Sequence, residues 1–261
     1  MTTGSVKVLV EERKLGTIAR VTIENSAKLN TLDSHLMIAF VGELEALAER
    51  GDLRAVVLTG AGTKAFIGGA NIFEMATLDA EHAEAFITLV HRSCNALREL
   101  PVPVIARVNG YALGAGIEIA AACDLRVASS NAVFGMPEVK VGIPSVVEAA
   151  LLPGLIGWGR TRELLLWGEN IDAATALAWE LIEYVAAPSE LDATVDARLD
   201  ALMAAGPHAV RLQKRLIRDW ENMALDQAVR AGIESFKQAY ATDEPARMMA
   251  AFVDRARQKK N

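Results

Sequence analysis

The chain has 261 residues, of which 52% are hydrophobic and 23% charged, a composition typical of one folded domain or of a core with an appendage. Its formal net charge of −6 gives no general attraction to nucleic acids or anionic lipids, and we expect neither as a partner. No apolar run approaches the ~18 residues that span a bilayer, and the first residues lack the basic-then-apolar pattern of a signal peptide, so we expect a cytoplasmic protein without membrane contact.

Strands and helices are predicted to alternate along the first half of the chain. Apolar or alternating runs predict strands over residues 6–10, 17–23, 55–59, 104–108 and 125–128. Apolar residues that recur every three or four positions predict helices over residues 34–50, 79–100 and 117–123, with Asp79 as the N-cap of the second. This alternation is typical of an α/β fold.

The sequence pattern changes beyond about residue 188. Four helices are predicted, over residues 189–204, 207–220, 225–240 and 245–257, with no strand between them. Pro207 and Pro245 suit the first turn of a helix. We therefore expect a core with the active site over residues 1–200 and a C-terminal helical region over residues 201–261. Such a region needs a surface to pack against, and a neighbouring subunit is the expected one.

Several classes of chemistry lack support in the sequence. The two cysteines, Cys94 and Cys123, stand among apolar neighbours at helical spacing, which favours buried thiols over a disulfide or a nucleophile. The four histidines are scattered, and no His-x3-His or Cys-x2-Cys pair suggests a metal site. The glycine-rich segments complete neither a dinucleotide nor a phosphate-loop pattern, and the Gly-x-Ser-x-Gly pattern of serine hydrolases does not occur. Carboxylates and backbone groups are left to carry the chemistry.

Two glycine-rich segments are predicted to present backbone N–H groups to a ligand. In residues 64–75 an apolar strand breaks at Gly68-Gly69 and continues as a helical turn capped by Asn71. In residues 108–124 small residues precede a helix whose first N–H groups and positive dipole end are unsatisfied. Two such donors on one oxygen would stabilise a developing oxyanion, an arrangement whose loss costs ~10²–10³ in rate. A glycine-rich segment taken alone is more commonly a simple turn, and the presence of two favours the ligand site only modestly.

These segments carry a family resemblance. The two signature segments of the enoyl-CoA hydratase/isomerase (crotonase) family strongly resemble Lys64-Ala-Phe-Ile-Gly-Gly-Ala-Asn-Ile-Phe-Glu-Met75 and Val108-Asn-Gly-Tyr-Ala-Leu-Gly-Ala-Gly-Ile-Glu-Ile-Ala-Ala-Ala-Cys-Asp124. The resemblance continues at residues 134–139, 142–144, 240–244 and 251–255, and so covers nearly the whole chain. It implies an α/β spiral of ββα repeats, followed by a C-terminal α-helical oligomerisation region through which relatives form trimers, commonly paired into hexamers.

The resemblance also implies roles for individual residues. The N–H groups of Ala70 and Ala115 would form an oxyanion hole, and Glu118 and Glu138 match the two catalytic glutamates. The other matched positions would bind the substrate and its coenzyme A portion: Lys28, Lys64, Gly68, Gly69, Asn71, Ile72, Gly114, Phe236 and Arg255. Of these, Phe236 and Arg255 match residues that the family contributes to a neighbouring subunit's site. No separate cofactor is implied, because coenzyme A enters as part of the acyl-CoA thioester substrate.

The residues themselves are compatible with these roles. Glu118 follows Ala115 by three positions on a predicted helix, and its apolar neighbours are unusual for a solvent-exposed carboxylate. Glu138 lies in a non-periodic segment, where a turn residue is the alternative. Two close carboxylates hold different protonation states, because ionising both costs repulsion. Such a pair supplies the base that activates water and the acid that protonates a carbon during hydration.

The chain departs from the family pattern at three places. Asn71 stands where the family usually has Asp, and Asn caps a helix equally well. Ala115 replaces the middle glycine of Gly-Gly-Gly, and its methyl group narrows the acyl pocket. Residues 144–148, Pro-Ser-Val-Val-Glu, replace the Pro-Gly-x-Gly-Gly of many hydratases, which leaves the natural substrate open. Glu148 is expected on a helix surface, with a third polar group near the site as the alternative.

Hydration of a 2-enoyl-CoA thioester by both glutamates is the function that the sequence favours. The alternatives are a double-bond isomerase, which needs one carboxylate, and a decarboxylase or thioester hydrolase on the same scaffold. RNA binding, found in relatives with a lysine-studded helix, is not favoured, because residues 34–50 contain no lysine. The sequence does not fix the acyl group or its length, nor does it separate a trimer from a hexamer.

Overall fold

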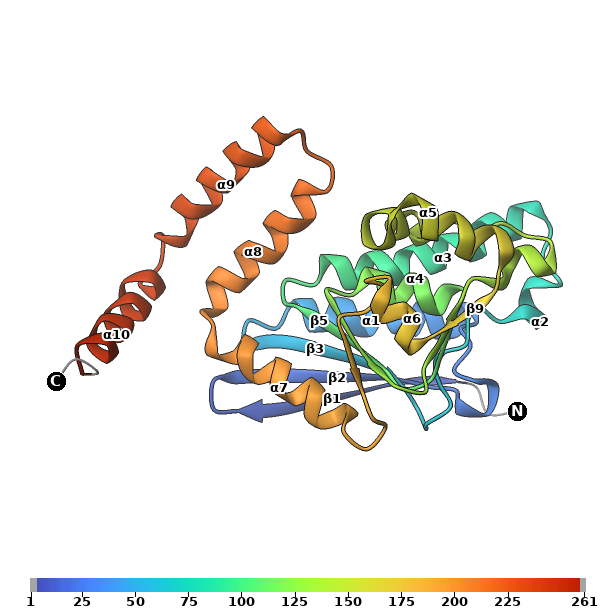
Figure 1. Ribbon diagram of the computed structural model, residues 1–261, viewed down its shortest axis with the longest axis horizontal. Coiled ribbons are helices and arrows are strands. Elements are labelled where there is room, and N and C mark those ends of the chain that lie inside the picture. Colours follow the sequence, from blue (N-terminus) through green and yellow to red (C-terminus); the bar gives the residue numbers. More distant parts are fainter. Residues whose placement is uncertain (1–3, 259–261) are drawn as a thin grey trace.

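The computed structural model describes residues 4–258, and their side chains as far as Asp254. Two β-sheets lie at its centre (Figure 1). The larger sheet has the strand order β1 (Ser5–Arg13), β2 (Gly16–Glu24), β3 (Leu53–Gly60), β5 (Val104–Val108), β7 (Leu125–Ser129) and β10 (Tyr184–Ala186). The smaller sheet has the order β4 (Ala65–Ile67), β6 (Tyr111–Leu113), β8 (Val133–Gly135) and β9 (Asn170–Asp172).

The larger sheet is buried on both of its faces. From β2 onward its neighbouring strands pair in parallel, and only β1 pairs antiparallel, with β2. Successive side chains of a strand point to opposite faces, so in β3 Val56 and Leu58 enter the main core while Ala55 and Val57 enter a second cluster on the other face. This two-sided burial explains why the sequence there is a continuous apolar run rather than an alternating one.

Three successive repeats share one plan: a strand of the larger sheet, a strand of the smaller sheet, and then a helix. β3 and β4 lead to α2 (Ile72–Met75) and α3 (Ala80–Glu99), and β5 and β6 lead to α4 (Ala115–Ala122). β7 and β8 lead through two 3-10 helices, η2 (Pro137–Val141) and η3 (Val147–Leu151), to α5 (Leu152–Trp167). The predicted α/β spiral of ββα repeats is confirmed.

Helices cover the two faces of the larger sheet (Figure 1). The main core lies between the sheets and α1 (Ser34–Ala48), α3 and α4, while α6 (Ala173–Ala178) follows β9 and packs beside β10. On the opposite face, α7 (Leu191–Ala204) buries Leu191, Val195, Leu199 and Met203 against the sheet. The core boundary predicted at residue 200 therefore falls inside α7, whose buried face continues to Met203.

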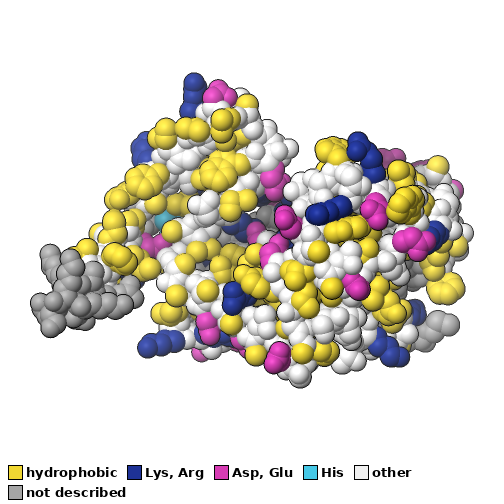
Figure 2. Space-filling view, in the orientation of Figure 1, with side chains coloured by type: hydrophobic (Ala, Val, Ile, Leu, Met, Phe, Trp, Pro, Cys, Tyr) yellow, Lys and Arg dark blue, Asp and Glu magenta, His cyan; other side chains and the backbone are white. Residues whose placement is uncertain are grey.

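Three helices follow α7 and extend away from the sheets (Figure 1): α8 (Pro207–Trp220), α9 (Leu225–Ala239) and α10 (Glu244–Gln258). Their hydrophobic side chains gather on the visible surface of this arm (Figure 2), and Phe236 on α9 is 68% exposed. An apolar surface of this extent on a helical arm is typical of a segment that packs against another chain.

Within residues 4–258, none of the helices combines the length and the apolar character needed to cross a membrane.

Lys214 fixes the arm to the core. Lys214 is buried on α8. Its Nζ donates hydrogen bonds to the carbonyl oxygens of Leu97 (3.2 Å) and Val102 (2.9 Å) and to Oδ2 of Asp124 (2.7 Å). Because Leu97 lies on α3 and Asp124 precedes β7, one ammonium group joins three separate segments. A buried cation is stable only with such a complete set of acceptors.

We predict that Lys214→Met lowers the free energy of unfolding by ~2 kcal/mol, because the three acceptors lose their common donor while the side-chain volume is kept. Urea denaturation followed by circular dichroism measures the loss. Lys237→Met is the matched control, since Lys237 forms an exposed ion pair with Glu234 and its loss should change stability by less than ~0.5 kcal/mol. Equal stability of the two variants would contradict the anchoring role of Lys214.

Candidate active site

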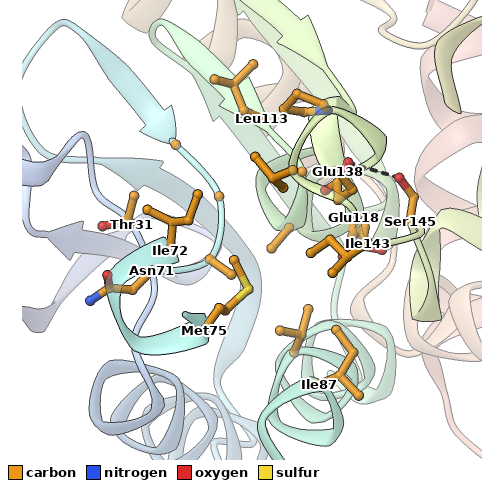
Figure 3. Close-up of a pocket in the computed structure, with 18 of the residues that line it drawn as sticks. Thr31, Asn71, Ile72, Met75, Ile87, Leu113, Glu118, Glu138, Ile143 and Ser145 are labelled. Atoms are coloured by element: carbon orange, nitrogen blue, oxygen red, sulfur yellow. Dashed lines mark hydrogen bonds between the residues drawn. The ribbon is translucent and has the colours of Figure 1, made fainter. Parts of the chain in front are cut away.

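A cavity of about 530 Å³ opens between α2, α3, α4 and the segment around η2 (Figure 3). Most of its lining is apolar and includes Met75 and Ile87. Ile72 and Met75 stand on one side of the cavity, and Glu118 and Glu138 lie together on the opposite side (Figure 3). An apolar pocket with a few convergent polar groups is the usual form of a small-molecule site.

The turn after β4 forms one wall of the cavity. Gly69 takes a φ of 105°, a conformation that glycine adopts without strain. Ala70 forms an isolated parallel bridge with Leu32. The bonds of this bridge are Leu32 N–H to Gly69 O (2.9 Å) and Asn71 N–H to Leu32 O (2.7 Å), so the N–H of Ala70 itself points away from Leu32. Asn71 then caps α2 by accepting the N–H of Phe73 at 3.1 Å, as predicted.

The start of α4 forms the opposing wall. Ala115 is the first residue of this helix, so its N–H has no acceptor within the helix. Gly114, directly before it, has a φ of 51°, and a Cβ at this position would overlap Oε1 of Glu138. A Cβ at Gly116 would overlap the carbonyl oxygen of Ile67, the last residue of β4. The two glycines thus let α4 touch both the glutamate and the strand.

Two backbone N–H groups are available to a ligand in this cavity. Within residues 4–258, neither Ala70 N–H nor Ala115 N–H makes a hydrogen bond to the protein, and both residues line the cavity. Both belong to a strand-to-helix turn, where the following helix adds its positive dipole end. A carbonyl oxygen that accepted both groups would be stabilised as negative charge developed on it.

Glu118 is a buried carboxyl group in the first turn of α4. The residue is 4% exposed, and its Oε1 accepts the N–H of Ala149 at 3.2 Å. The pKa of Glu118 is raised to about 8, mainly by burial and then by the charge of Glu138; the Ala149 hydrogen bond opposes the rise, and the charge of Glu148 makes the smallest contribution to it. At neutral pH Glu118 therefore holds a proton.

Glu138 lies on η2 beside Glu118 (Figure 3). Burial raises the pKa of Glu138, and two hydrogen bonds oppose the rise, one from its own backbone and one from Ser145. Ser145 Oγ donates to Oε2 of Glu138 at 2.9 Å. This hydrogen bond favours the ionised form of Glu138, while Glu118 keeps its proton. Of the two carboxyl groups, Glu118 has the larger rise in pKa and therefore holds its proton more firmly.

The structure brings most of the predicted site residues to this one cavity. Its lining includes Lys28, Gly68, Gly69, Ala70, Asn71, Ile72, Gly114, Ala115, Glu118 and Glu138. Lys64 does not line the cavity, because it precedes β4 and its carbonyl oxygen accepts the N–H of Tyr111 at 3.0 Å. Phe236 lies on α9 in a different groove of this chain, and the side chain of Arg255 lies outside the described residues.

Two polar features of the site differ from the sequence interpretation. Ser145, noted only as part of a departure from the family pattern, orients Glu138. Glu148 was expected on a helix surface, and this is wrong, because the residue is 8% exposed and bonded to His91 Nδ1 at 2.8 Å. The sequence gives no periodicity around 148 that could have revealed this burial.

Among the described residues, no three His, Cys, Asp or Glu side chains are grouped so as to hold a metal ion.

Two neighbouring carboxyl groups and two unpaired backbone N–H groups in one cavity of a ββα spiral suit an enzyme that moves protons on its ligand. A profile of the enoyl-CoA hydratase/isomerase family matches residues 13–260. The short-chain-enoyl-CoA hydratase of Clostridium acetobutylicum is 38% identical over 93% of each chain, and the crotonyl-CoA hydratase of Syntrophomonas wolfei is 32% identical over 95% of each chain. The crystal structure of an enoyl-CoA hydratase from Bacillus anthracis superposes with a TM-score of 0.90 at 29% identity, over 95% of this chain and 96% of that one.

The chain therefore belongs to the enoyl-CoA hydratase/isomerase family and is an enzyme of that family. The resemblance predicted from the two glycine-rich segments is confirmed.

The raised pKa of Glu118 predicts a pH-dependent difference in stability between the wild type and Glu118→Gln. Between the ordinary value of 4.5 and about 8, the folded protein keeps a proton that the unfolded chain has released, so the free energy of unfolding falls as pH rises through this window. Glutamine removes this contribution. The free energy of unfolding of the variant, relative to that of the wild type, should therefore rise by about 2–4 kcal/mol from pH ~5 to pH ~8.

Chemical denaturation of both proteins across this pH range measures the difference. Glu163→Gln is the control, because Glu163 is exposed on α5 and its replacement should give a difference that does not vary with pH. A Glu118→Gln difference that stays constant with pH would show that Glu118 has an ordinary pKa in the folded protein.

Proposed function

We propose that this enzyme is an enoyl-CoA hydratase that adds water across the conjugated double bond of a short 2-enoyl-CoA thioester. The observation that carries the proposal is the shared cavity, which brings two unpaired backbone N–H groups together with the carboxyl groups of Glu118 and Glu138, both of which have a raised pKa. The names of two relatives, a short-chain-enoyl-CoA hydratase and a crotonyl-CoA hydratase, support the substrate class and the short acyl chain.

The proposed chemistry assigns one task to each group. The thioester carbonyl oxygen accepts the N–H groups of Ala70 and Ala115, which stabilise the enolate-like charge that forms as water attacks Cβ. The ionised carboxylate of the pair takes a proton from the attacking water, and the protonated carboxyl group gives its proton to Cα. The elements of one water molecule are added, and the pair ends the reaction with the single proton it held at the start.

The coenzyme A portion of the bound substrate is proposed to extend out of the cavity past Lys28, which is one of the lining residues. Phe236 and Arg255 would reach the same cofactor portion from a neighbouring subunit, in a trimer or a hexamer. The exposed apolar side chains of α9 and α10 support self-association through this arm. Size-exclusion chromatography with light scattering distinguishes the monomer, the trimer and the hexamer.

No separate cofactor takes part in the proposed reaction, because coenzyme A enters with the substrate and the acid–base groups belong to the chain.

A cytoplasmic location is part of the proposal. Cys94 and Cys123 are free thiols, which is typical of a protein from a reducing compartment.

We predict that Glu118→Gln and Glu138→Gln each lower kcat for hydration of crotonyl-CoA by ~10² or more, because each removes one partner of the proton pair and preserves the shape of the side chain. The loss of conjugated-thioester absorbance measures turnover, and Glu163→Gln serves as the control for removing a carboxylate from the surface. Near-normal turnover of either variant would contradict the two-glutamate mechanism and favour a double-bond isomerase that needs one carboxylate.

A further inference from the structure

Glu148 is a buried carboxyl group that the proposed chemistry does not use. It lies on η3, is 8% exposed, and does not line the cavity. Its Oε1 is bonded to Nδ1 of His91 on α3 at 2.8 Å, and its Oε2 has no hydrogen-bond partner among residues 4–258. A buried carboxyl oxygen without a partner lowers stability, so packing alone does not account for a glutamate at this position.

The backbone on both sides of Glu148 is held in an unusual geometry. Val147 has a φ of 38°, in the left-handed region that a β-branched residue rarely adopts. The N–H of Ala149, on the other side, is shared between the carbonyl oxygen of Val146 (2.9 Å) and Oε1 of Glu118 (3.2 Å). Strain of this kind persists only where surrounding contacts enforce it, and it clusters at functional sites. The bond from Glu148 to His91 is one of the contacts that tie this strained segment to α3.

The charge of Glu148 also acts on Glu118. The pKa of Glu118 is raised first by burial, then by Glu138 on η2, and also by Glu148 on η3. On α3, the pKa of the Cys94 thiol is raised well above its usual value by burial and then by the charges of Glu148 and Glu118, and a side-chain hydrogen bond to Glu148 adds to the rise. β4 and β6, which also pack against α4, present only apolar side chains and the exposed Tyr111.

We propose that Glu148, anchored by His91, is a positioning residue for Glu118: it holds Ala149, whose N–H bonds the Glu118 carboxyl group, and it places a second carboxyl group next to this bond. The effect on catalysis rests on the proposed hydratase function. It assigns a task to the Val-Val-Glu segment that stands where many hydratases carry glycines. The anchoring part concerns geometry, and the charge part concerns the pH at which Glu118 loses its proton.

Glu148→Gln tests the charge part, because glutamine keeps the size of the side chain and an oxygen for His91 but removes the negative charge. The alkaline limb of the kcat/KM profile for crotonyl-CoA should move to lower pH by about one unit or less, since one neighbouring like charge is lost. Glu163→Gln, on the exposed face of α5, should leave the limb in place. A Glu148→Gln profile that superposes on the wild type would overturn the charge part.

His91→Leu and His91→Gln test the anchoring part as a matched pair. Leucine removes the hydrogen-bond donor, and we expect kcat to fall ~10-fold with KM little changed, because Glu118 loses its fixed orientation while the cavity is unaltered. Glutamine retains an N–H donor and should recover most of kcat. Equal kcat values for the leucine variant and the wild type, or equal losses in both variants, would overturn the anchoring part.

A measurement without turnover separates this inference from the proposed hydration. Infrared difference spectra taken along a pH titration follow the carboxyl C=O band of Glu118, identified by its disappearance in Glu118→Gln. The band should be lost at lower pH in Glu148→Gln than in the wild type. A wild type without hydratase activity would sink the proposed function and leave this shift intact, whereas an unshifted band would refute the role of Glu148 even in an active hydratase.

Discussion

The close approach of α4 to β4 is the constraint on which the site depends. Gly116 allows it, since any side chain there would overlap the carbonyl oxygen of Ile67. The approach places the first residue of α4 beside the turn that follows β4, so the unpaired N–H groups of Ala115 and Ala70 share one cavity. Hydrogen-bond donors that are rigidly held before a charge forms stabilise it most effectively, because nothing has to reorganise during the reaction.

The same helix carries Glu118 into the interior, and this decides the electrostatics of the site. Burial and the charge of Glu138 hold the pKa of Glu118 near 8, while Ser145 favours the ionised form of Glu138. Glu118 therefore holds its proton more firmly than Glu138, which is the difference that the proposed acid and base roles require. Ala115 and Glu118 lie on α4, and Ala70 and Glu138 lie on segments that line the same cavity. A thioester bound by the two backbone N–H groups would therefore have its neighbouring carbons next to the carboxyl groups proposed to transfer protons.

Long, regular elements could be predicted from the sequence, and short or interrupted ones could not. The strand at residues 104–108 and the helix at 207–220 have the predicted bounds, because the strand is a mostly apolar run that follows Pro103 and the helix keeps its periodicity over its full length. The strands β6, β8 and β9 have three residues each, too few to show a period. The helix α5 contains Pro153 and a left-handed Gly157, so its sequence does not read as helical. The site residues near 70, 115, 118 and 138 followed from the family motifs, whereas the burial of Glu148 depends on tertiary contacts with α3.

A crystal structure of the protein with an unreactive acyl-CoA thioester analogue tests the central claim most directly. The account predicts that the thioester oxygen lies within ~3.2 Å of the backbone nitrogens of both Ala70 and Ala115, with the acyl Cα and Cβ facing Glu118 and Glu138. A thioester oxygen beyond hydrogen-bond reach of both nitrogens, or an acyl chain directed away from the two carboxyl groups, would contradict it.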